Sequence, residues 1–141
     1  MRRFYEFQAR LYVSCFIIAL AACGSNWKAT AHVLGDRTLS ALELASTTAD
    51  NMVIAKTMTP LQRQTFAKEV MVPATTALEG AIQSVIAWQE GEPIPENVSR
   101  LVGILFKAVD DTAKTFGASS ELHNVLLTAR NRANGLLAQV Q

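Results

Sequence analysis

The chain has 141 residues, half of them hydrophobic, which is enough for one compact domain with its own core. Thirteen Lys and Arg residues against twelve Asp and Glu residues give a formal net charge of +1, without any block of like charges. Affinity for nucleic acids depends on clustered cations, and the few aromatic residues do not alternate with basic ones. Composition and charge therefore argue against a nucleic-acid-binding protein.

The first 22 residues have the organisation of a secretory signal peptide. Three arginines precede a run from Leu11 to Ala22 that is apolar except for Ser14. A helix of this length covers roughly 18 Å, too short for a hydrocarbon core of ~30 Å, so a transmembrane helix does not fit. A buried N-terminal helix would leave unexplained why the positive charges come first and why the run ends in Ala-Ala-Cys-Gly.

The segment Leu20-Ala21-Ala22-Cys23 resembles the lipobox of bacterial lipoproteins, in which Leu, a small residue and then Ala or Gly precede Cys. The resemblance covers only the leader. It implies that the thiol of Cys23, a good soft nucleophile, receives a diacylglyceryl group and that the leader is removed just before it. At about 0.8 kcal/mol per buried methylene, two or three acyl chains hold a protein on a membrane permanently. A cleaved signal peptide without lipid and a structural N-terminus are the alternatives.

This interpretation divides the chain into a signal peptide (residues 1–22), a lipidated tether (23–30) and a helical domain (31–141). The second cysteine, Cys15, is discarded with the leader, so the domain has no disulfide and relies on its core. Gly24 follows the lipidated cysteine where Asp would favour retention in the inner membrane. By the same resemblance, we expect a protein of the bacterial cell envelope on the periplasmic face of the outer membrane.

The mature chain begins with two predicted helices. Apolar residues recur at three- and four-residue steps from residue 29 to about residue 58, with Gly35 expected to break or fray the start. Thr59, Pro60 and Gln62 then carry the N-cap, first-position and capping-box signals of the second helix. The turn between the two helices must therefore be very tight.

Pro73 lies inside the second predicted helix, which should be long and kinked, since the apolar stripe resumes almost in phase up to residue 90. The linker "EGEPIPEN" leads to a third helix, which Gly117 should end, and a fourth runs from residue 119 or 120 to residue 140. No segment alternates as a strand would. The sequence thus predicts an all-α fold, a small antiparallel bundle of about four helices.

No metal-ligand spacing, nucleophile elbow or phosphate loop occurs in the sequence. His32 and His123 are solitary, whereas a helical zinc site needs two ligands four residues apart and a third nearby. Asp110 and Asp111 point about 100° apart on a helix, and each has a lysine four residues away, which favours a solvated face. We therefore expect no catalytic residue, no metal and no cofactor, and no enzyme.

Charged segments could serve as recognition patches, although outer faces and loops are ordinarily charged. The acidic linker contains Glu90, Glu92 and Glu96, and the last helix carries Arg130 and Arg132. The aromatic residues favour a core over a ligand site; they are Phe66, Trp88, Phe106 and Phe116.

Anchoring without catalytic chemistry predicts an envelope lipoprotein whose helical domain binds another protein, as an accessory, chaperone-like or exclusion factor. Pilotins of secretion systems and small lipoproteins carried by phages or plasmids are similar in size and anchoring. The alternative is a periplasmic carrier of a small apolar ligand or lipid, because an Ala-rich first hairpin and the Pro73 kink could open a cavity. A structural spacer is the third possibility.

Overall fold

The computed structural model describes residues 27–141, so the predicted signal peptide and the lipidation site at Cys23 lie outside the described residues. Its elements are α2 (Trp27–Ile54), α3 (Pro60–Phe66), η1 (Ala67–Met71), α4 (Val72–Ala87), α5 (Glu96–Phe116) and α6 (Glu121–Ala138). Because α3, η1 and α4 follow one another without interruption, they form one helix of 28 residues. The described residues therefore form four long helices and no strand, which confirms the all-α prediction.

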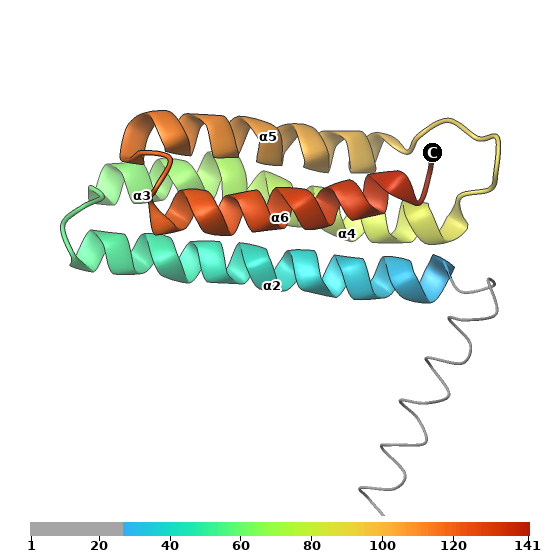
Figure 1. The fold of residues 1–141 in the computed structure, drawn as a ribbon, viewed down its shortest axis with the longest axis horizontal. Coiled ribbons are helices and arrows are strands. Elements are labelled where there is room, and N and C mark those ends of the chain that lie inside the picture. The colour runs from blue at the N-terminus through green and yellow to red at the C-terminus, as the bar shows by residue number, and fades with distance from the viewer. Residues whose placement is uncertain (1–26) are drawn as a thin grey trace, which may run out of the picture.

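The four long helices run alternately up and down around a common core (Figure 1). α2 packs against α6 and α4, α5 packs against the same two helices, and the diagonal contact between α4 and α6 is small. The start of α2, the loop between α4 and α5, and the C-terminus share one end of the bundle, here called the N-terminal end (Figure 1). The turns at residues 55–59 and 117–120 form the opposite end, here called the turn end.

α2 begins earlier and is more regular than predicted. It starts at Trp27, so residues 27–30, predicted as part of the tether, are helical. Gly35 does not fray the helix. It is buried, and a Cβ atom at this position would lie 2.5 Å from Cδ1 of Ile82, so the glycine allows α4 to approach α2 closely.

α2 ends at Ile54, a few residues before the predicted end, in a tight turn. The backbone N–H groups of Thr57 and Met58 both donate to the carbonyl of Met52, at 2.9 and 3.2 Å. Lys56 has a φ of 60°, a left-handed conformation that reverses the chain within these few residues. The prediction of a very tight connection is confirmed.

The second helix begins as predicted with a capping box. The Thr59 hydroxyl accepts from the Gln62 N–H at 3.1 Å, and the Gln62 side chain accepts from the Thr59 N–H at 2.8 Å. Arg63 then ties this helix to α2 by donating to Asp50 at 2.7 Å and to Ser46 at 2.9 Å. The helix ends at Ala87 instead of residue 90.

Pro73 distorts this helix without ending it. The five residues directly before α4, Ala67–Met71, form a π turn, in which the N–H of Val72 donates to the carbonyl of Ala67. Proline has no N–H, and its ring clashes with the carbonyl four residues earlier in an α-helix. A wider turn just before Pro73 relieves this clash, and so the helix continues as predicted.

The last two helices agree with their sequence signals. α5 ends at Gly117, whose φ of 94° suits glycine, and the Ser120 hydroxyl accepts from the N–H of His123 at the start of α6. Buried residues form two clusters. The first lies towards the N-terminal end and includes Leu42, Leu78, Val85, Val98, Leu101, Leu105, Leu136 and Val140. The second lies towards the turn end and consists of Ala45, Ala49, Met58, Phe66, Ala108, Val109, Leu122 and Leu126.

Of the described helices, Pro60–Ala87 is long and apolar enough to be a candidate membrane span, with a mean hydropathy of 1.3 in its most apolar window. Its exposed face carries charged residues, among them Lys68, Glu69 and Glu79. Its buried residues pack in the core of the bundle against α2 and α5. In that window 28% of the helix is buried, so one face lies in the core and the rest is partly or fully exposed.

Candidate functional site

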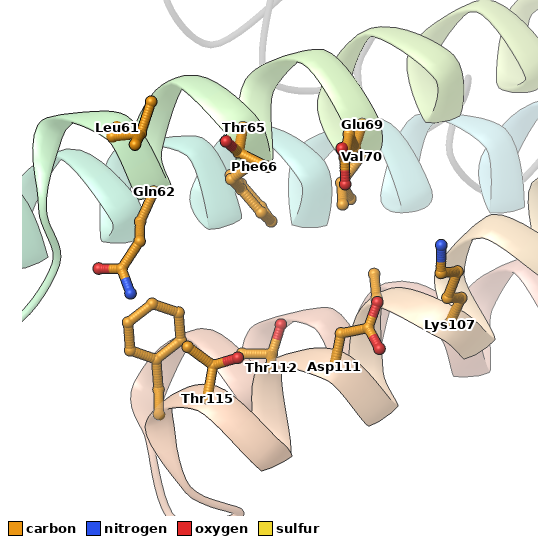
Figure 2. Close-up of a pocket in the computed structure, with 12 residues that line it drawn as sticks. Leu61, Gln62, Thr65, Phe66, Glu69, Val70, Lys107, Asp111, Thr112 and Thr115 are labelled. Atoms are coloured by element: carbon orange, nitrogen blue, oxygen red, sulfur yellow. The ribbon is translucent and has the colours of Figure 1, made fainter.

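A groove lies between α3–η1 and α5 at the turn end of the bundle (Figure 2). Its volume is about 290 Å³. One wall is formed by Leu61, Gln62, Thr65, Phe66, Glu69 and Val70. The other is formed by Lys107, Ala108, Asp111, Thr112, Thr115 and Phe116. The two helical walls face each other, and the groove is open to solvent.

The groove exists because the bundle is not closed at this end. α4 packs along α5, whereas α3, the N-terminal part of the same long helix, has no close backbone contact with α5. The change from contact to separation coincides with η1, the π segment that accommodates Pro73. Two lining residues, Glu69 and Val70, belong to this segment. The long helix therefore loses contact with α5 on the N-terminal side of the segment that Pro73 distorts.

The groove has an apolar floor and a polar rim. Phe66 is only 8% exposed, and its ring points into the groove (Figure 2). Phe116 lines the other wall and is half-buried. Leu61 is 72% exposed at the open end, a large apolar side chain left in water. Gln62 and Thr65 add hydrogen-bonding groups to the rim. This combination is typical of a surface that binds another molecule.

Three charged side chains, Glu69, Lys107 and Asp111, stand on the rim and are exposed. Ion pairs in the described part of the chain are Asp50 with Arg63, Glu96 with Arg100, and Asp110 with Lys114. The expected four-residue pair of Asp110 with Lys114 is thus confirmed, whereas the expected pair of Lys107 with Asp111 does not form, and neither residue has an ion-pair partner within residues 27–141. The rim charges of the groove remain available to a bound molecule.

The ion pair of Asp110 with Lys114 on α5 changes the pKa of the lysine. The ammonium group of Lys114 lies 2.8 Å from the carboxylate of Asp110. The hydrogen bond to Asp110 raises the pKa of Lys114 above its ordinary value of 10.5, with smaller contributions from the charges of Asp110 and Asp111. The carboxylate of Asp110 is therefore paired with Lys114, whereas that of its neighbour Asp111 on the rim has no ion-pair partner in the described residues.

The two histidines lie apart from the groove and from each other. His32 is exposed on α2, and the ring Nδ1 of His123 lies 3.2 Å from the carbonyl of Val109. In residues 27–141, no group of three or more His, Cys, Asp and Glu residues could hold a metal ion.

The basic residues of α6 are used within the domain. The guanidinium of Arg130 stacks 4.7 Å above the ring of Phe106, and Arg132 donates to the carbonyl of Arg37 at 2.7 Å. Phe106 is 49% exposed, so its prediction as a core residue is wrong. The guanidinium of Arg130 covers one face of the ring and is attracted to it by a cation–π interaction.

The acidic linker is also tied to its surroundings. Glu92 accepts the N–H of Gln89 with its carboxylate at 2.9 Å and the indole N–H of Trp88 with its carbonyl at 3.1 Å. Glu96 pairs with Arg100 at 3.1 Å. These contacts define the course of the loop between α4 and α5.

The groove does not follow from the sequence. Leu61 and Phe66 are both apolar residues of the second predicted helix, but the first is exposed at the mouth and the second is buried in the floor. Only Pro73 signalled a distortion at this level of the bundle. No protein-family model, curated protein or solved structure matches the chain.

Proposed function

We propose that this chain is a bacterial envelope lipoprotein, anchored by lipid on Cys23, whose helical domain binds another protein. The basic head, the apolar run and the lipobox of the leader support the anchor. Gly24 supports a position on the periplasmic face of the outer membrane. The protein acts as an accessory, chaperone-like or exclusion factor, and its role is binding and not catalysis.

The position of the groove is the observation that carries this proposal. α2 begins at Trp27, four positions after Cys23, so a lipid on that cysteine holds the N-terminal end of the bundle near the membrane. The groove lies at the turn end. A helix of 28 residues is about 42 Å long, so a bundle that stands upright on the membrane would hold the groove at up to about that distance from it. A partner in the aqueous compartment can reach it there.

The form of the groove favours a protein over a carried small molecule. At about 290 Å³ it has a size at the lower limit of small-molecule sites. Such sites bury ~70–90% of their ligand, whereas this groove is open along its length. Side chains projecting from a partner need no enclosure, because the partner itself covers them.

The anchor is tested by the intact mass of the membrane-extracted protein and by its N-terminal peptide. We expect a chain that begins at Cys23 and carries acyl groups. The variant Cys23→Ser should keep the helical circular dichroism and the thermal unfolding of the domain but leave the membrane fraction. Cys15→Ser is the matched control, since it alters the other cysteine within the leader and should leave acylation intact. An unmodified chain that begins at Met1 would contradict the proposal.

A further inference from the structure

The walls of the groove restrict what kind of protein segment can enter it. Both walls, α3–η1 and α5, are helical, and the described residues offer no strand edge to which an extended peptide could add. Two helices pack when the ridges of side chains on one fit into the grooves between side chains on the other. An amphipathic helix is the segment that such a surface binds, through apolar residues spaced one turn apart.

The floor provides the apolar contact for such a helix. Phe66 and Val70 stand one turn apart on one wall, and Ala108 and Phe116 line the other. Leu61 extends this surface to the turn end, where 72% of its side chain is exposed. Phe66 and Ala108 are already buried, so a partner would remove apolar surface from water mainly at Leu61, Val70 and Phe116.

The charges on the rim favour a positively charged residue in the bound segment. Figure 2 shows Glu69 on one wall and Asp111 on the opposite wall, with Lys107 one turn before Asp111 along α5. None of the three takes part in an ion pair within the described residues. A cationic side chain above the floor would therefore meet a carboxylate from each wall. Lys107 distinguishes the two ends of the groove and so favours one direction of a bound helix.

We propose that the groove between α3–η1 and α5 binds an amphipathic helix of another protein, with apolar residues on the Phe66 and Phe116 floor and a Lys or Arg between Glu69 and Asp111. This inference rests on the proposed function for its location and adds the site and the class of partner.

Site-specific photo-cross-linking in the native host tests the occupant. Benzoylphenylalanine replaces Thr65 or Thr115, which are exposed on opposite walls. Gln83, exposed on α4 outside the groove, is the control position. After irradiation, the adduct is digested and its peptides are sequenced by mass spectrometry. Both groove positions should capture the same segment of one other protein, with apolar residues at helical spacing and a Lys or Arg among them, and Gln83 should not.

Charge reversal tests the role of the carboxylates in the same cells. Glu69→Lys and Asp111→Lys should each lower the yield of the adduct by roughly two- to fivefold, as expected for rim charges. Asp110→Lys is the matched control, because Asp110 neighbours Asp111 on α5 but is paired with Lys114 outside the groove. Its yield should not change. All three positions are exposed, so these substitutions leave the core intact.

Several outcomes would overturn this assignment. They are an adduct with a second copy of the chain, an adduct with a lipid or small molecule, a captured segment without basic residues or helical spacing, and the absence of an adduct. Insensitivity of the yield to both charge reversals would do the same. Lipidation of Cys23 is tested separately, by the intact mass of the same protein. An unlipidated chain that still gives the expected adduct would remove the proposed location and leave the groove assignment standing.

Discussion

The two ends of the bundle are built from the same four helices but differ in how closely the long second helix approaches α5. Towards the N-terminal end, large aliphatic residues such as Leu101, Leu136 and Val85 are fully buried between α4, α5 and α6. Towards the turn end, leucines such as Leu122 and Leu126 are fully buried as well, but the cluster has eight buried residues against 15 in the first. α3, which precedes the π segment, has no close backbone contact with α5 there.

This difference separates stability from binding within one small domain. The first cluster contains more buried apolar residues than the second, so the N-terminal end should contribute more to the free energy of unfolding. The turn end keeps a groove lined by partly exposed apolar side chains, which a domain selected only for stability would cover. The predictions below compare matched substitutions at these two ends or on the inner and outer faces of the helices.

The largest effect is expected for Leu101→Ala. Leu101 is fully buried in the first cluster, and truncating such a residue leaves a cavity that costs ~2–5 kcal/mol of unfolding free energy. Leu61→Ala at the mouth of the groove removes the same atoms from a side chain that is already mostly in water, and should change the free energy by less than ~0.5 kcal/mol. Urea denaturation followed by circular dichroism measures both.

Equal destabilisation by Leu101→Ala and Leu61→Ala would contradict the division into a stabilising end and a binding end. A stable Leu61→Ala variant that loses the cross-linked adduct would sharpen it.

Two glycines provide the next comparison. Gly35→Ala places a Cβ atom 2.5 Å from Cδ1 of Ile82, so either the Ile82 side chain or the two helices must shift, at an expected cost of ~1–3 kcal/mol. Gly103→Ala places a Cβ atom in open space in the middle of α5 and should stabilise the protein by up to ~1 kcal/mol, since alanine favours helix. Opposite signs in thermal unfolding are the expected result. A stabilising Gly35→Ala would show that Ile82 can move aside at no cost.

Thr59→Ala should have an intermediate effect at the turn end. It removes the hydroxyl that accepts from Gln62 and leaves an N–H group of the helix start without its cap, which costs ~1 kcal/mol. Thr59→Ser keeps the oxygen and is the matched control. Loss of stability in both variants would mean that the cap is not the cause.

The sequence was sufficient to predict the parts of the fold that depend on neighbours in the chain. The capping box at Thr59, the helix end at Gly117 and the start at Ser120 were predicted because each depends on residues within one turn. Gly35 was misinterpreted because its reason is Ile82, far along the chain. Phe106 was assigned to the core because the sequence does not show that Arg130 covers its ring.

The groove could not be predicted for a related reason. Pro73 indicated a distortion, but its location and its effect on the opposite wall depend on how α5 packs beside the long helix. Apolar periodicity treats Leu61 and Phe66 alike, although only the second is covered by the core. Where helices separate is a property of tertiary packing, and so is a groove between them.

The smallest effect concerns the paired and unpaired lysines of α5. Because the pKa of Lys114 is raised in the folded protein, its stabilising contribution is fully present below 10.5, the ordinary value, and is lost as the pH rises through the higher folded value. Lys114→Gln should therefore lower the midpoint of thermal unfolding slightly at pH 8, with the difference from the unaltered protein vanishing at strongly alkaline pH. Lys107→Gln should leave the midpoint of thermal unfolding at pH 8 unchanged, since Lys107 forms no ion pair within the described residues.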